Sequence, residues 1–236
     1  MTIKTLLNFS QYLILALPIA LITGPFFSDF IAIILNLVFI YILIKKKDIK
    51  FLKNKFFYFF LLFWFLFLFR SFFSDDILFS VKSSFSFLRS VILPFAIYYI
   101  LRMSSEDYFK KYYRTLFLLI AIFIFDMIFQ YFVGHNLLGF KIENPDKING
   151  LFGDEGISGS YLLRFLPLIL ISVFFINYEK KNYLLFLTFS FVIYAIFISG
   201  SRSSFFLSCI FIFLFFLFFK EFRKYLLIGF FSLSLM

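Results

Sequence analysis

The stretch TLFLLIAIFIFDMIFQYFV, residues 115–133, decides the class of fold, because it holds a single charged side chain, Asp126, among nineteen residues. A helix of this length rises about 28 Å, close to the roughly 30 Å of hydrocarbon in a membrane. Its apolar residues run continuously and do not alternate, as they would in the strands of a membrane β-barrel. The stretch therefore predicts a membrane-spanning helix.

Seven further apolar runs of similar length surround this one, with charged gaps between them: residues 6–23, 26–44, 56–73, 82–101, 159–177, 183–199 and 203–219. A ninth run, 225–236, rises only about 18 Å and predicts a helix that ends inside the bilayer. We interpret it as a truncated span rather than a re-entrant one. We expect an all-α, polytopic helical bundle with about eight full spans and a partial ninth. It forms a single integral-membrane domain over 1–236, the N-terminal part of a longer protein.

The composition excludes a soluble chain. It is 63% hydrophobic and 15% charged and contains 46 phenylalanines, whereas an average globular protein is about 45–50% apolar and about 25% charged. Soluble enzymes, disordered tails and disulfide scaffolds are therefore excluded; the lone cysteine, Cys209, has no partner within the chain. The sequence has no metal-ligand spacing and no phosphate-loop pattern, so we expect no metal and no cofactor.

The net charge of +10 is distributed unevenly along the chain. Lys4 and the gaps 45–55, 102–114, 178–182 and 220–224 hold sixteen of the 23 basic residues. The positive-inside rule then places the N-terminus in the cytoplasm and the long loop at about 134–158 in the periplasm. Since most of the charge indicates orientation, no nucleic-acid partner is needed to explain it.

The seven basic residues on the outer side differ in kind: Arg70, Lys82, Arg89, Lys141, Lys147, Arg164 and Arg202. Four of the seven are arginine, against three of the sixteen inner ones, and guanidinium binds phosphate or carboxylate through two parallel hydrogen bonds. Lys82 and Arg89 are seven residues apart and share a helix face with Ser86 between them. Arg89 falls within a span, which indicates an anion site, an ion pair with a structural acid such as Asp126, or a side chain that snorkels outward.

Asp126 and Gln130 are four residues apart and therefore lie on one face of their helix. Asp126 is interpreted as a structural counter-ion for an arginine, with proton acceptance as the alternative. The loop at about 134–158 is rich in glycine, asparagine and aspartate, which predicts a folded loop. It brings Lys147, Asp154 and Glu155 close to Arg164.

The run Ser199-Gly-Ser-Arg202-Ser-Ser predicts a tight turn between two spans. Free amides and serine hydroxyls at the start of the next helix, beside Arg202, form an anion site, while helix capping is the alternative role for the serines. We expect Arg164 and Arg202 to lie within about 10 Å of one another, a range over which exposed charges still interact. His135, the only histidine, is interpreted as incidental rather than as a general base.

The order of these motifs resembles the O-antigen ligase and polymerase family. The resemblance runs from Asp126 and Gln130 through Lys147-Ile-Asn-Gly-Leu-Phe-Gly-Asp-Glu155 and Gly159-Ser-Tyr-Leu-Leu-Arg164-Phe-Leu-Pro167 to the turn at 199–204. It covers about residues 55–220 and is most specific over 126–204. Members of that family are many-span proteins of the bacterial inner membrane. They transfer glycan chains from an undecaprenyl-pyrophosphate carrier at the periplasmic face, without a metal or a nucleotide sugar.

The resemblance implies a metal-independent glycosyltransferase with three groups of site residues. These are Asp154 or Glu155 as the catalytic base, Arg89, Lys147, Arg164 and Arg202 around the pyrophosphate, and Asp126, Gln130 and Ser203 in support. The implied partners are the undecaprenyl-pyrophosphate-linked glycan and the lipid bilayer. The chain departs from the family at Lys147, where arginine is common, at Ser201, and in lacking the large periplasmic loop and last spans of ligase-type members.

Two other functions stay open from the sequence. A transporter of an anionic solute would use Arg89 near the middle of the bilayer, although no internal repeat of the transporter kind is evident. A non-catalytic membrane partner in envelope polysaccharide assembly is the second alternative. The sugar, the linkage, the acceptor and the oligomeric state are not determined by the sequence.

Overall fold

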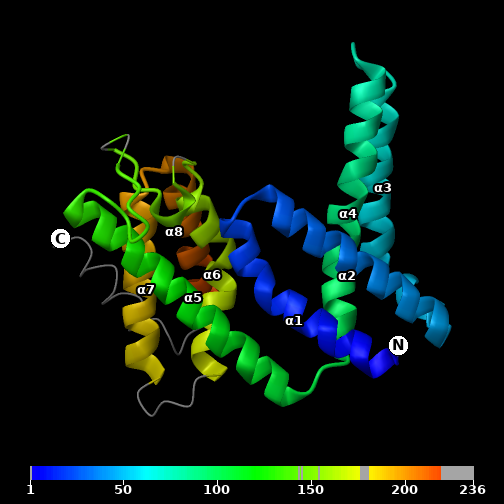
Figure 1. Cartoon of the computed structure of the whole chain (residues 1–236), viewed down its shortest axis with the longest axis horizontal. Coiled ribbons are helices and arrows are strands. Elements are labelled where there is room, and N and C mark those ends of the chain that lie inside the picture. The colour runs from blue at the N-terminus through cyan, green and yellow to red at the C-terminus, as the bar shows by residue number, and fades with distance from the viewer. Residues whose placement is uncertain (1, 143, 145, 154, 176–180, 219–236) are drawn as a thin grey trace. The chain divides into compact units, whose positions relative to one another are not determined.

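The computed structural model describes residues 2–142, 144, 146–153, 155–175 and 181–218, and these residues form helices joined by short turns and one long loop (Figure 1). The α-helices are α1 (Ile3–Ile22), α2 (Pro25–Lys46), α3 (Lys55–Ser71), α4 (Ile77–Arg102), α5 (Glu106–Val133), α6 (Ser158–Phe175), α7 (Lys181–Ile198) and α8 (Arg202–Phe218). Two 3-10 helices, η1 (Ile49–Leu52) and η2 (Gly150–Phe152), lie in the connections. Each α-helix contains most or all of one of the eight full apolar runs, although α4 and α5 begin five and nine residues before theirs, so the all-helical class is confirmed for the described residues.

Four of these helices, α1, α2, α4 and α5, are long and apolar enough to cross a membrane. The other four are apolar but only 17 or 18 residues long. Together they make this an all-helical chain of the membrane type, and the crossing of all eight stays a prediction. The partial ninth run, 225–236, lies outside the described residues.

Local signals in the sequence set several helix starts. The Asn54 side-chain oxygen accepts the Phe56 N–H at the start of α3, and the Asp76 carboxylate accepts the Phe79 N–H at the start of α4, each at 3.0 Å. Pro25 opens α2, where its missing N–H costs nothing because that position has no helical acceptor. Charged and capping residues in the gaps therefore divide the apolar sequence into separate helices.

Within the single predicted domain, the helices group into two compact units, and the first is Met1–Ser105. Its core lies between α2 and α4, where Phe39, Ile42, Ala96 and Tyr99 are buried. The helices α3 and α4 form a hairpin with a polar seam. The indole N–H of Trp64 donates to the Ser84 carbonyl at 2.8 Å, and further serine hydroxyls bond across the same seam.

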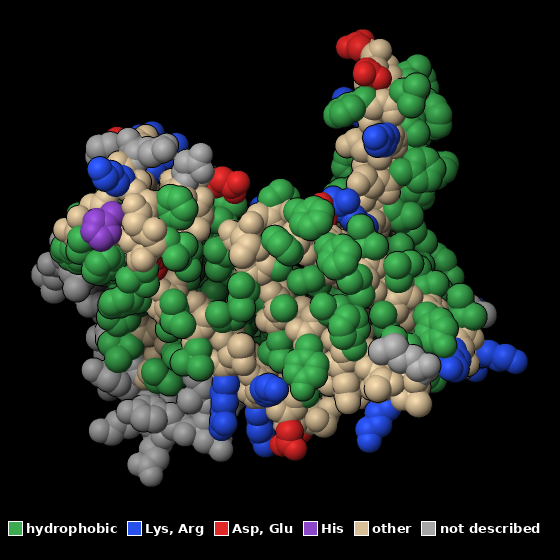
Figure 2. All heavy atoms as spheres, viewed as in Figure 1, with side chains coloured by type: hydrophobic (Ala, Val, Ile, Leu, Met, Phe, Trp, Pro, Cys, Tyr) green, Lys and Arg blue, Asp and Glu red, His purple; other side chains and the backbone are tan. Residues whose placement is uncertain are grey.

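The second unit is Glu106–Met236, with α5, α6, α7 and α8 in its described part. Its core combines Phe123 from α5, Leu162 and Leu166 from α6, and Val192 and Ile196 from α7, all of them buried. The loop from α5 to α6 packs on this unit where α5 ends and α6 begins. In both units hydrophobic side chains cover most of the face in Figure 2, as expected for helices whose solvent is lipid.

Candidate functional site

A buried polar cluster joins the end of α5 to the loop that follows it. The Asp126 carboxylate accepts the Leu137 N–H at 2.7 Å, and the Gln130 side-chain oxygen accepts the Gly150 N–H at 2.7 Å. Both side chains are almost completely buried, at 0% and 1% exposure. They bond two amides of the loop, one of them fully buried, so their first role is to hold the loop in place.

Asn136 completes this cluster from the loop itself. Its amide donates to the Gly150 carbonyl at 2.8 Å, and its oxygen accepts the N–H groups of Leu138 and Phe140. One buried asparagine thus fixes a turn of its own and ties that turn to η2. The loop is folded, as its turn residues predicted.

Asp126 does not act as a counter-ion in this arrangement. The ion pairs among the described residues join Arg89 to Asp29 and Lys110 to Glu106, and neither includes Asp126. The second Asp126 oxygen is buried without a hydrogen-bond partner in the described part of the chain. The prediction that Asp126 pairs with an arginine is therefore wrong for the described residues. Its partner is the backbone amide of Leu137.

The loop also packs on the turn between α7 and α8. The Ile148 N–H donates to the Ile198 carbonyl at 3.3 Å, and the Ser158 hydroxyl donates to the Ile148 carbonyl at 2.9 Å. Glycines allow the close approach. A Cβ on Gly200 would collide with the Asp146 carbonyl, and one on Gly159 would collide with the Ser199 hydroxyl.

Lys147 lies in this contact. Its Cγ is 3.2 Å from the position that a Cβ on Gly200 would occupy, and its Cδ is 4.0 Å from the corresponding position on Gly156. The side chain is exposed, and Arg202 follows Gly200 by two residues. Residues separated by more than fifty positions in the sequence thus meet at one edge of the second unit.

Arg202 is the first residue of α8. The Ser201 carbonyl accepts the Phe205 N–H at 3.0 Å, and the hydroxyls of Ser201 and Ser204 lie 2.8 Å apart. Ser201 therefore directly precedes α8, with its hydroxyl bonded to that of Ser204, and capping by the serines of this turn stays a prediction. Arg202 and Ser203 are exposed beside it, where the helix N-terminus favours negative charge.

The other predicted site residues of this unit are close to these in the sequence, and fewer contacts are described for them. Arg164 is exposed on α6, about 140° around the helix from Gly159, and its distance from Arg202 stays a prediction. Glu155 is exposed in the turn before α6. Asp154 lies outside the described residues. His135 places Nδ1 3.1 Å from the Asn136 carbonyl oxygen at the surface of the loop.

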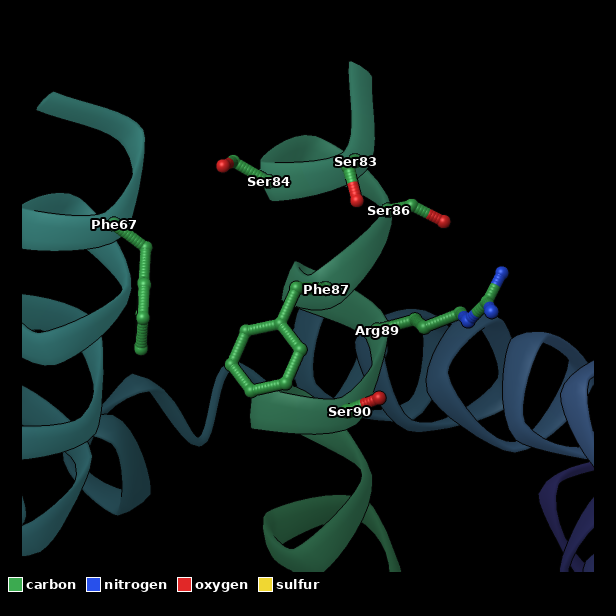
Figure 3. A pocket seen from close by; sticks show the side chains of 7 residues that line it. All are labelled: Phe67, Ser83, Ser84, Ser86, Phe87, Arg89 and Ser90. Carbon is green, nitrogen blue, oxygen red and sulfur yellow. The ribbon is translucent and has the colours of Figure 1, made fainter. Parts of the chain in front are cut away.

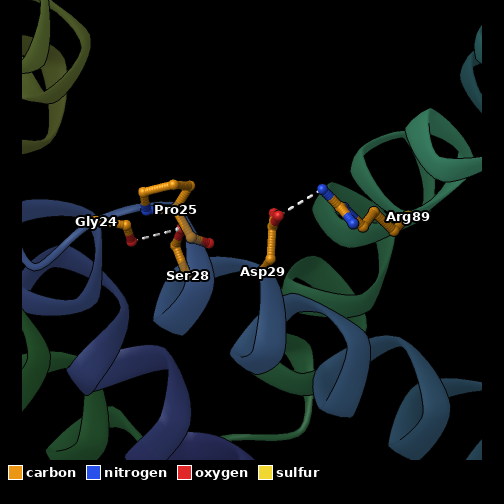
Figure 4. Close-up of polar contacts among 5 residues, drawn as sticks. All are labelled: Gly24, Pro25, Ser28, Asp29 and Arg89. Atoms are coloured by element: carbon orange, nitrogen blue, oxygen red, sulfur yellow. Dashed lines mark hydrogen bonds and ion pairs between the residues drawn. The ribbon is translucent and has the colours of Figure 1, made fainter. Parts of the chain in front are cut away.

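Arg89 belongs to the first unit and is ion-paired. A guanidinium nitrogen is 2.5 Å from an Asp29 carboxylate oxygen, and Figure 4 shows the two side chains extending toward each other from α4 and α2. The Asn36 amide also donates to the Arg89 carbonyl at 2.8 Å. The arginine thus has an acidic partner, as one interpretation expected, and that partner is Asp29.

A pocket of about 370 Å³ lies beside Arg89 along α4 (Figure 3). Its lining residues are Phe67, Ser83, Ser84, Ser86, Phe87, Arg89 and Ser90. Ser86, Arg89 and Ser90 point to the same side of α4, whereas Ser84 and Phe87 point toward α3. The predicted shared face is therefore seen for Ser86 and Arg89, and Lys82, one turn before Ser86, is exposed.

Three important polar residues were not identified from the sequence: Asp29, Asn36 and Asn136. Each is a single polar residue whose partner lies elsewhere in the chain or on the backbone. Asp29 and Asn36 are seven residues apart on α2, so they share a face, and this spacing was the one available signal.

No protein family, no curated protein and no solved structure matches this chain.

Proposed function

We propose that this protein transfers or polymerises lipid-linked glycan units at the periplasmic face of a bacterial inner membrane, which it crosses several times with a cytoplasmic N-terminus. The carrier in this proposal is undecaprenyl pyrophosphate, and the enzyme is a metal-independent glycosyltransferase. The observation that carries the proposal is the position of Lys147, whose side chain packs beside Gly200, two residues before Arg202. The loop that carries Lys147 is therefore in contact with the turn that precedes Arg202, which supports a shared anion site.

The chemistry needs cations of this kind. When the glycosidic bond to the pyrophosphate breaks, negative charge develops on the leaving group and is stabilised by nearby fixed positive charge. Arg202, Lys147 and the free amides at the start of α8 supply that charge in the second unit. The acceptor hydroxyl loses its proton to Glu155 or Asp154, and Arg164 and Ser203 lie on the helices that follow.

A lipid carrier also needs an apolar route to the protein. An apolar pocket of about 310 Å³ lies between α5, α6 and α7, with Ile124, Ile169 and Leu187 among its lining residues. A hydrocarbon chain suits such a surface because it makes no demand for hydrogen bonds. This pocket supports the proposal that the substrate enters from the membrane.

The test is replacement of Arg202 by lysine, which keeps the charge but removes the planar fork. In proteoliposomes that contain an undecaprenyl-pyrophosphate-linked oligosaccharide, we expect the rate of glycan transfer to fall at least tenfold. Arg70→Lys is the matched control, because Arg70 is an exposed arginine at the end of α3, outside the proposed site. Full transfer by Arg202→Lys would overturn the assignment of Arg202 to the pyrophosphate.

The serine-lined pocket beside Arg89 favours a second candidate, a transporter of an anionic solute. In that function the Asp29 carboxylate and the solute would compete for the same guanidinium. Uptake of a labelled organic phosphate into proteoliposomes, lost in Arg89→Gln, would support the transporter. Absence of uptake together with glycan transfer by the same preparation would exclude it.

A further inference from the structure

A dense group of lysines surrounds the connection between α2 and α3. Lys45, Lys46, Lys47, Lys50, Lys53 and Lys55, here called the lysine collar, are all exposed. Residues 45–55 contain one acid, Asp48, so the collar has an excess of five positive charges over eleven residues. The gap 102–114, by comparison, has four basic and two acidic residues. Orientation alone would not require so large an excess in one connection.

The connection is folded rather than a loose linker. Phe51 of η1 packs edge-on against Phe39 and Tyr99, with ring centroids 5.9 and 4.8 Å apart. Leu52 packs against the same core cluster. Lys47 ends α2 in a left-handed conformation at φ 53°, with its N–H bonded to the Ile44 carbonyl. Because the apolar side chains of the connection are anchored in the unit, its lysines are held on the outside.

The collar charges are not neutralised within the described residues. Neither of the two ion pairs found there includes a collar lysine. The one acid of the connection, Asp48, accepts a hydrogen bond from the Tyr99 hydroxyl at 3.4 Å. Lys45 lies 3.2 Å from the Tyr41 hydroxyl, a neutral partner that leaves its charge uncompensated. The collar is therefore complementary to an external anion.

We infer that the lysine collar is a binding surface for the headgroups of anionic phospholipids. It adjoins the end of α2, one of the helices long and apolar enough to cross a membrane, so its lysines lie at the depth of lipid phosphates. Exposed aromatic side chains of α3, including Phe56 and Phe59, begin directly after the collar and provide apolar surface for the acyl chains of the same lipids. The lipid headgroup thus contacts the collar, and the acyl chains of the same lipid contact the start of α3. Figure 2 shows lysine and arginine side chains at the edge of the molecule where α2 ends in Figure 1.

Trp64, the only tryptophan of the chain, reports on this surface. It lies nine residues after Lys55, about 14 Å along α3, within reach of the acyl chains of a lipid bound at the collar. The full chain is reconstituted in mixed bilayers in which either phosphatidylglycerol or phosphatidylcholine has brominated chains. Bromine quenches the fluorescence of Trp64, and the extent of quenching by each lipid gives the relative affinity of the two lipids.

We expect a preference of about fivefold or more for phosphatidylglycerol, since each lysine near an anionic surface contributes roughly that factor. A tenfold rise in salt, which shortens the screening length about threefold, should reduce it.

Substitutions distinguish lipid binding by the collar from attraction of the lipid to the net positive charge of the whole protein. Replacing Lys50, Lys53 and Lys55 together by glutamine should reduce the preference toward parity, and replacing the same three by arginine should keep it. The matched control is Lys110→Gln with Lys111→Gln, which removes two basic residues from the first turns of α5, outside the collar, and should change nothing. Equal quenching by both lipids in the wild-type protein would overturn the proposal. So would displacement of the lipid by inorganic phosphate at constant ionic strength, which would indicate a site for small anions instead.

Discussion

Gly200 packs against the main-chain carbonyl of Asp146 so closely that the structure leaves no room for a side chain there. The contact joins the loop after α5 to the turn before α8, and it positions Lys147 beside Gly200, two residues before Arg202. Gly200 also has φ of 67°, a conformation that L residues adopt at a cost. The proposed anion site therefore depends on one glycine that touches no substrate.

Replacement of Gly200 by alanine should destabilise the second unit by about 3 kcal/mol. A left-handed conformation costs about 1–2 kcal/mol for a residue with a Cβ, and the collision with the Asp146 carbonyl adds to that cost because backbone cannot move aside. Gly134→Ala is the control, since Gly134 also has a positive φ, 88°, at the end of α5 and nothing within 4 Å of its Cβ position. Thermal unfolding in detergent measures both variants. Equal losses in the two would show that the contact with Asp146 has no energetic weight.

Asn136 bonds three backbone groups of the loop, so Asn136→Ala should cost about 3 kcal/mol: about 1–3 kcal/mol for the buried Gly150 carbonyl, and about 0.5–1.5 kcal/mol for each of the two part-buried N–H bonds. Hydrogen exchange should speed up at the amides of Leu138 and Phe140, which donate to its oxygen. Asn144→Ala is the control, because Asn144 is exposed and bonds only the nearby Asp146 amide among the contacts of its side chain described here. Unchanged exchange in Asn136→Ala would contradict the role given to this residue.

Two substitutions at Asp126 distinguish a structural role of this residue from a role in proton transfer. In Asp126→Asn the side-chain oxygen still accepts the Leu137 N–H, so the free energy of unfolding should change by less than about 1 kcal/mol, whereas Asp126→Leu leaves that amide without a partner and should cost about 1–3 kcal/mol. We expect glycan transfer to persist in Asp126→Asn. Loss of transfer at an unchanged unfolding midpoint would instead assign Asp126 the proton-accepting role.

The helices could be predicted from the sequence because each apolar run is long, continuous and free of alternation, and this local pattern favours a helix without reference to any other part of the chain. The folded loop was predictable for a similar reason, since glycine and asparagine at 134–158 act locally. What Gln130 does was only partly predictable. The face of α5 on which Gln130 lies follows from its spacing to Asp126. Its bond to Gly150 spans twenty residues and depends on the loop folding back against the end of α5.

Pairings between distant residues could not be predicted in this way. Asp29 and Arg89 are sixty positions apart, and nothing in either local sequence identifies the other. The close approach of Gly159 to Ser199 is similar. A glycine in the sequence allows another group to pack against the backbone, but it does not identify that group. Tertiary packing determines such contacts, and packing is what a single sequence leaves open.

The depth of Arg89 gives the last prediction. Its partner Asp29 is four residues into α2, about 6 Å from the start of that helix, and the two side chains are 34% and 42% exposed. Asp29 is thus near a helix end although Arg89 is halfway along α4, and the partial exposure of both side chains indicates a solvated pair. A double-mutant cycle with Asp29→Asn and Arg89→Gln should therefore give a coupling below about 1 kcal/mol that weakens with salt, because a solvated pair is screened. A pair enclosed in hydrocarbon would behave differently, since either single substitution would leave an unpaired charge and cost about 3–5 kcal/mol. A large coupling that salt does not change would return Arg89 to the interior of the bilayer, where the sequence first placed it.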